Sequence, residues 1–150
     1  MSLQWSSDLE LDIPVIDSQH KRIVDYINKV EVAHKHHSHN ELMDVLDELV
    51  DYTLSHFAFE ETLMEEAGYP FLKAHQKVHA LFTRRVNGYY QQAKAGADVT
   101  DELMHTLKAW LINHIKHDDL DYGDMVKANM DAATKRAKSR KASWMSRLFG

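Results

Sequence analysis

Residues 42–64 read LMDVLDELVDYTLSHFAFEETLM and form the most regular pattern in the chain. Apolar residues recur there every three or four positions, which is the period of one face of an α-helix. His56 and Glu60 share that face, because positions four apart stack above one another on a helix. The pattern therefore predicts a helix that turns two polar side chains toward the core. The stripe comprises Leu42, Val45, Leu46, Leu49, Tyr52, Thr53, His56, Phe59, Glu60, Leu63 and Met64.

Three further stretches repeat this helical period, at residues 18–34, 72–93 and 100–114. The chain has only 5 glycines and 2 prolines, which favours long helices over a turn-rich β fold. Short loops between four such helices predict an all-α, up-down-up-down antiparallel four-helix bundle.

The ends of the helices are predicted from capping residues. Asp17 or Ser18 is expected to cap the first helix, and Thr100 to begin the fourth. Gly123 is expected to end or bend the fourth helix. We expect an irregular N-terminal arm before the first helix, a bundle domain at residues 1–131 and a basic, amphipathic C-terminal tail at residues 132–150.

The amino-acid composition limits which metal sites the chain can form. The 150 residues suit one domain, and the absence of cysteine excludes disulfides, zinc–thiolate sites and iron–sulfur clusters. Histidine and carboxylate remain as strong metal ligands. The sequence shows no secretory signal and no apolar run near the roughly 20 residues that span a bilayer, so a cytoplasmic protein is expected.

Charge is distributed unevenly. Residues 132–150 hold six Lys or Arg and no acid, which leaves 12 basic and 23 acidic residues elsewhere, a net charge of −11. An acidic body argues against nucleic acid as a partner. If the tail is helical, Trp144, Met145, Leu148 and Phe149 share one face. A tail that folds back on the bundle or stays disordered is the first expectation, and contact with a membrane surface or an acidic partner is the alternative.

Histidines and carboxylates lie on the inward stripe of every predicted helix, and no Lys or Arg accompanies them there. Buried polar groups need partners, and a buried carboxylate needs positive charge, so metal ions would satisfy them together. Two octahedral ions accept five histidines, two bridging carboxylates and a bridging oxygen with one position left open, as expected for iron. The candidates are His20, His56, Glu60, His75, His79, His114 and Asp119.

Spacing alone leaves the last carboxylate open. Asp119 is five residues from His114, roughly 140° away on an ideal helix, whereas Asp118 stacks better at four residues. A local bulge in the helix would bring Asp119 round.

The ligand spacings resemble those of a bacterial hemerythrin over residues 5–122, through His20, His56-x-x-x-Glu60, His75-x-x-x-His79 and His114 with Asp119. The resemblance implies that His75, His79 and His114 hold one iron and that His20 and His56 hold the other. Glu60 and Asp119 would bridge the two ions. Dioxygen would bind reversibly at the second iron as a ferric hydroperoxide, for oxygen carriage, storage or delivery rather than for an enzymatic reaction.

An apolar shell is expected to keep water from this oxygen pocket. The candidates for that shell are Ile23, Phe57, Phe59, Trp110 and Leu111.

Other functions are weighed against this one. A ferritin-like oxidase would need two inward Glu-x-x-His pairs, for which the chain offers Glu31 with His34 and Glu102 with His105. His105 and His114 are nine residues apart, about 180° on the helix, so they cannot both face inward. Oxygen or redox sensing and a di-iron peroxidase remain as alternatives. The site does not need the remaining histidines: His34, His36, His37, His39, His105 and His117. The cluster at 34–39 is expected on the solvated surface, with adventitious binding of Zn or Ni as the alternative.

Overall fold

The computed structural model of the chain describes residues 3–119 and 121–132, and its described part is helical with no strand. The elements are η1 (Ser7–Leu9), α1 (Pro14–Lys35), α2 (His39–Ala67), α3 (Leu72–Lys94), α4 (Thr100–Asn113) and the π-helix η2 (His114–Asp119). Residues 121–132 are helical again. The predicted tail lies largely outside the described residues.

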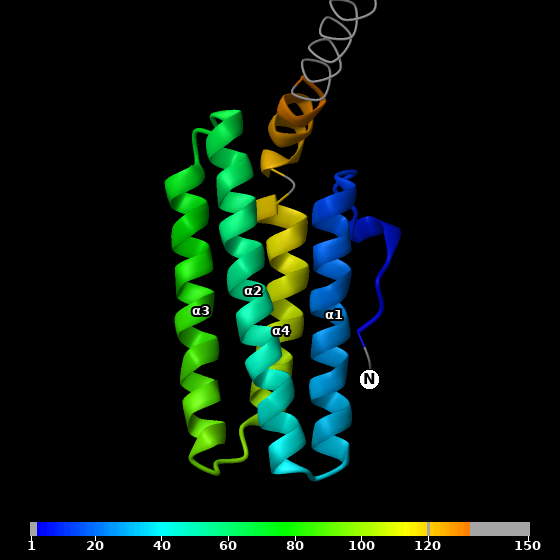
Figure 1. Cartoon of the computed structure of the whole chain (residues 1–150), viewed down its shortest axis with the longest axis vertical. Coiled ribbons are helices and arrows are strands. Elements are labelled where there is room, and N and C mark those ends of the chain that lie inside the picture. Colours follow the sequence, from blue (N-terminus) through cyan, green and yellow to red (C-terminus); the bar gives the residue numbers. More distant parts are fainter. Residues whose placement is uncertain (1–2, 120, 133–150) are drawn as a thin grey trace, which may run out of the picture.

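The four long helices stand side by side, and short loops join them at alternate ends of the molecule (Figure 1). This is the predicted up-down-up-down bundle. Residues 3–13 run along the outside of α1 before the chain enters the bundle. Among the described helices, none is both long and apolar enough to cross a membrane.

The first helix begins earlier than its capping residues predicted. Pro14 occupies the first turn of α1, where its missing N–H and fixed φ cost nothing. Asp17 is therefore inside the helix, and its carboxylate accepts a hydrogen bond from the backbone N–H of Leu11 at 2.8 Å. The expected cap at Asp17 or Ser18 is wrong, because Asp17 fastens the N-terminal arm instead.

The starts of α2 and α4 follow their sequence signals. The hydroxyl of Ser38 accepts a hydrogen bond from the backbone N–H of Glu41 at 3.2 Å and so caps α2. Thr100 is the first residue of α4, as predicted, and Asp101 and Glu102 lie in its first turn. Negative side chains there interact favourably with the helix dipole.

The fourth helix does not end at Gly123, which lies within the helical residues 121–132. Tyr122 and Val126 are buried, at 0% and 1% exposed, and they anchor this last stretch against the bundle. Burial of these side chains outweighs the low helix propensity of one glycine. The irregular turn comes earlier, in η2.

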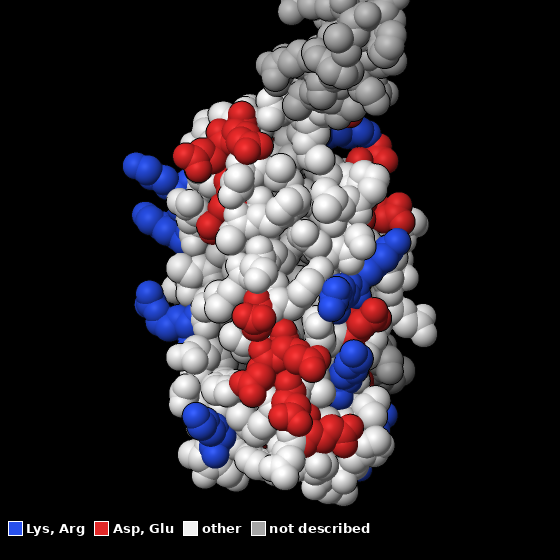
Figure 2. Space-filling model, viewed as in Figure 1, with Lys and Arg blue, Asp and Glu red and all other residues white. Residues whose placement is uncertain are grey.

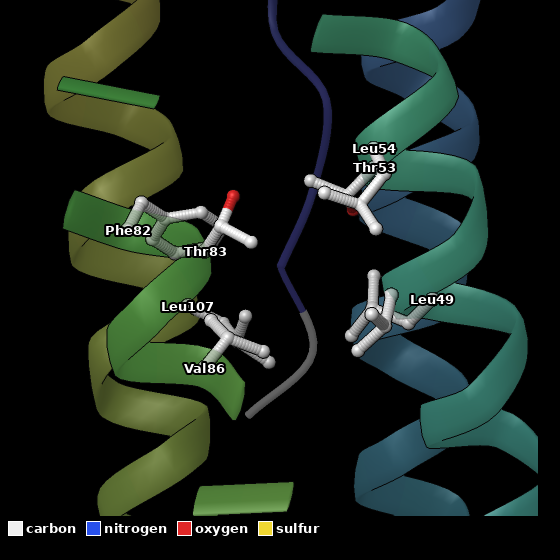
Figure 3. Close-up of a pocket in the computed structure, with 8 residues that line it drawn as sticks. Leu49, Thr53, Leu54, Phe82, Thr83, Val86 and Leu107 are labelled. Atoms are coloured by element: carbon white, nitrogen blue, oxygen red, sulfur yellow. The ribbon is translucent and has the colours of Figure 1, made fainter. Parts of the chain in front are cut away.

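The core next to the histidines is apolar and nearly full. A cavity with about 10 Å³ available to a water-sized molecule lies one turn away from His56 and His79, between α2 on one side and α3 and α4 on the other. Figure 3 shows Leu49 and Thr53 facing Val86 and Leu107 across it. That volume is at the lower limit for a single water molecule.

The surface carries the expected acidic charge. Figure 2 shows acidic side chains gathered along α2 and flanked by lysine and arginine side chains. The exposed acids of α2 in this region include Asp44, Asp47, Glu48 and Asp51.

Candidate metal centre

All seven predicted ligand residues are buried. Their exposed fractions run from 0% for His20, Glu60 and Asp119 to 5% for His75. One side chain comes from α1, two each from α2 and α3, and two from the π-helix η2. The bundle brings together residues separated by up to about a hundred positions in sequence: His20, His56, Glu60, His75, His79, His114 and Asp119.

The ligand atoms fall into two groups, and the atoms of each group lie within 4.8 Å of one another. Glu60 belongs to both groups. The larger group contains Glu60, His75, His79, His114 and Asp119, and the smaller contains His20, His56 and Glu60. Each group contains the donors that a borderline or hard cation such as iron takes in proteins.

Asp119 links the two groups through its two oxygens. Its Oδ2 lies 3.1 Å from Nε2 of His20, and its Oδ1 lies 3.2 Å from Nε2 of His75 and 3.0 Å from Nε2 of His114. Glu60 also contacts both groups of histidines. Its Oε1 lies 2.7 Å from Nε2 of His56 and 3.8 Å from Nε2 of His79. Both carboxylates therefore lie between the two groups of histidines.

The π-helix explains how Asp119 reaches the centre. Residues His114–Asp119 form one wide turn, in which hydrogen bonds run between residues five apart instead of four. The bulge that the spacing of His114 and Asp119 required is therefore present. The side chain of the competing residue, Asp118, lies outside what the structure describes.

Several of these buried atoms are left without a hydrogen bond. They are both ring nitrogens of His20, Oε1 of Glu60, Nε2 of His75 and both oxygens of Asp119. The short contacts between them lack hydrogen-bond geometry, and leaving buried polar atoms unpaired costs roughly 1–3 kcal/mol each. Atoms that converge without bonding one another are arranged as metal ligands are, so the residues present fit two ions.

Electrostatics favours the protonation states that bind metal. Burial and the neighbouring His114 and His75 lower the pKa of His79 to about 2, so its imidazole is neutral. Burial would raise the pKa of Asp119, but the nearby His114, His20 and His75 outweigh it and hold that pKa well below its usual range. Neutral imidazole and ionised carboxylate are the forms that coordinate metal.

Three residues around the ligands did not follow from the sequence patterns. Nδ1 of His56 lies 2.6 Å from Oε1 of Gln19, and Nδ1 of His79 lies 3.1 Å from Oε1 of Glu61. The hydroxyl of Tyr122 donates a hydrogen bond to Oε2 of Glu60. Such contacts fix the orientation of a ligand and tune its basicity. Gln19 and Glu61 each sit next to a ligand in sequence.

The aromatic candidates pack on the larger group. The ring of Phe57 stacks on His79 at 3.8 Å between centroids, and the ring of Trp110 stacks on His114 at 4.3 Å. Ile23 and Leu111 are buried at 4% and 2% exposed, and Phe59 is half-buried. The apolar surroundings predicted for the centre are present, while a role of these residues in an oxygen pocket stays a prediction.

The Glu-x-x-His residues that a ferritin-like oxidase would use lie outside the two groups of buried ligands. His105 and Glu102 are exposed, and Glu31 pairs with Lys35 and Lys108. Among the described residues, the two groups able to hold a metal contain none of these side chains.

Comparisons with known proteins agree with this geometry. Residues 11–126 match the family model described as Hemerythrin HHE cation binding domain. A bacteriohemerythrin of Pseudomonas aeruginosa is 51% identical over 145 residues, covering 97% of this chain and 94% of the relative. A bacteriohemerythrin of Stenotrophomonas maltophilia is 47% identical over 147 residues, covering 98% and 95%.

The fold agrees as well. A crystal structure of a wild-type hemerythrin superposes with a TM-score of 0.80 at 30% identity, covering 84% of this chain and 98% of the other. The chain therefore belongs to the hemerythrin family, whose members bind oxygen at a non-haem di-iron centre.

Proposed function

We propose that this protein binds dioxygen reversibly at a di-iron centre, for oxygen carriage, storage or delivery. The observation that carries the proposal is the division of Asp119 between two groups of buried histidines, with one oxygen toward each. A single ion would not need a carboxylate shared in this way.

We assign one iron to His75, His79 and His114 and the other to His20 and His56, with Glu60 and Asp119 bridging them. The two groups of converging atoms support this division. The group of His20 and His56 offers fewer protein ligands, so an ion held there would keep a coordination position for oxygen. Two ferrous ions, when bound, supply the electrons that hold dioxygen reversibly.

The surrounding side chains keep the reaction reversible by excluding water. Ile23, Phe57 and Leu111 are buried, and the ring centroid of Phe57 lies 6.0 Å from that of His56, a proposed ligand of the ion that would bind oxygen. Water or an outside proton that reached the bound oxygen would release it irreversibly, so a dry apolar wall favours binding over turnover.

The first experiment is anaerobic loading with iron, exposure to oxygen and then deoxygenation, followed by metal content and visible absorption. Two irons per chain and an absorption band that appears with oxygen and vanishes on its removal are expected. Irreversible decay of the band, or turnover with added peroxide and reductant, would contradict the proposal and indicate an oxidase or peroxidase. A chain that takes up no iron would refute the assignment.

We also propose that the protein is not an enzyme, works in the cytoplasm and delivers oxygen through residues 132–150 to a membrane surface or an oxygen-consuming enzyme. The six basic residues of that segment and its apolar residues Trp144, Met145, Leu148 and Phe149 support the last point. Deleting residues 132–150 is expected to abolish binding to anionic liposomes and to shift the protein out of the membrane fraction. Unchanged binding after the deletion would contradict the proposed delivery role.

A further inference from the structure

In each of the two groups, one histidine contacts a further side chain through its Nδ1 atom. These two contacting side chains differ in charge. Nδ1 of His79 meets the carboxylate of Glu61 at 3.1 Å, whereas Nδ1 of His56 meets the side-chain amide of Gln19 at 2.6 Å. Nε2 of each ring points into the centre, so a ring that binds an ion through Nε2 would carry its proton on Nδ1 and donate it to that oxygen. One imidazole therefore has an anionic acceptor and the other a neutral one.

The negative charge of Glu61 acts on His79 with little screening by solvent or by positive side chains. Its side chain is 27% exposed, and the ring it contacts is 3% exposed. Within the described part of the chain, the Glu61 carboxylate forms no ion pair with a lysine or an arginine. A partly buried carboxylate acts more strongly than an exposed one, because the surrounding medium screens its charge less.

We propose that Glu61 is a positioning residue that makes the two irons electronically unequal by stabilising the ferric state of the ion held by His79. A histidine that donates to a carboxylate is a more basic ligand, and a more basic ligand favours the ion of higher charge. Gln19 fixes the ring of His56 without adding charge. This inference rests on the proposed di-iron function and names a determinant of it.

The consequence for oxygen binding follows from the proposed ligand assignment. An iron held by His75, His79 and His114 would not offer the open position, so Glu61 would act on how readily that iron gives up its electron. Oxygen affinity would then depend on a residue that touches neither oxygen nor iron.

The test is a redox titration of iron-loaded protein with Glu61→Gln, which keeps the size of the side chain and a hydrogen-bond acceptor but removes the charge. The expected result is a rise in reduction potential that corresponds to a roughly tenfold change in the equilibrium constant, about 59 mV for one electron. Oxygen affinity is expected to fall in the same variant.

The matched control is Glu65→Gln, which removes the same charge from an exposed position one turn further along α2. Equal shifts in the two variants would mean a general charge effect and would overturn the inference. A second variant, Gln19→Glu, places a carboxylate behind His56 and is expected to lower the potential, and a rise would overturn the inference too. Two irons in each variant keep the proposed function standing in either case, whereas wild-type protein without iron refutes both.

Discussion

Asp119 is the residue whose position most directly supports a centre with two metal ions. Its carboxylate is fully buried, and its oxygens are divided between His20 on one side and His75 and His114 on the other. A charge in that position is tolerable only because positive or polarisable groups surround it, and two metal ions would supply the strongest compensation.

Asp119→Asn is expected to lower iron content from two ions to at most one per chain, because an amide lacks the charge and the second strong donor needed to bridge. The measurement is metal analysis of purified, iron-loaded protein. Asp118→Asn is the neighbouring control and is expected to keep two irons. The opposite pattern in these variants would move the bridge to Asp118.

Tyr122→Phe is expected to lower the free energy of unfolding of the metal-free protein by about 1.5–3 kcal/mol, the range for a hydrogen bond to a charged group. The variant removes only the hydroxyl that donates to Glu60, at a side chain that is 0% exposed. Urea denaturation measures the change. Tyr89→Phe is the control, since Tyr89 is half-buried and forms no hydrogen bond among the described residues. Equal losses in both variants would mean that the contact with Glu60 contributes nothing.

At the scale of the element, a glycine stabilises or destabilises the fold according to the backbone conformation at its position. Gly68 follows α2 with φ of 72°, a left-handed conformation that other residues adopt at a cost. Gly88 lies inside α3, where glycine is the weaker choice. A Cβ added at either position meets nothing within 4 Å, so the backbone alone decides the outcome.

Gly68→Ala is expected to destabilise the protein by about 1 kcal/mol, and Gly88→Ala to stabilise it by about 0.5–1 kcal/mol. Thermal unfolding of the two variants beside the wild type measures both effects. The same sign for both substitutions would refute the explanation.

Considering the whole molecule, the sequence predicts most of the fold and most of the centre. The helices follow from their period, and the residues that cluster in the centre stand out in the sequence because they lie on otherwise apolar stripes. Gln19 and Glu61 escape such reasoning, because they lie beside the stripes and reach a ring from another helix. Which ring each one meets depends on how the helices pack, and one sequence carries no direct record of that.

Removing the metal is expected to lower the unfolding temperature of the whole bundle, because the ions join all four long helices or their continuation. If each free ion is present at 1,000 times its dissociation constant, one site stabilises the fold by about 4.1 kcal/mol. For a chain of this size that is roughly 8–16 °C per site. Calorimetry of iron-loaded and chelator-treated protein measures the difference, and equal melting temperatures would mean that the ligands are equally well satisfied without metal.

The wide turn at His114–Asp119 also determines which genetic changes the gene can tolerate. An in-frame loss of one codon within that turn would place Asp119 four residues from His114, the spacing that stacks on an ordinary α-helix. Asp119, Tyr122 and Val126 would then keep the faces that they bury now. A codon lost between His56 and Glu60 in α2 would instead rotate everything beyond it by about 100°. The gene thus has one short stretch inside a helix in which a change of length leaves the buried faces aligned.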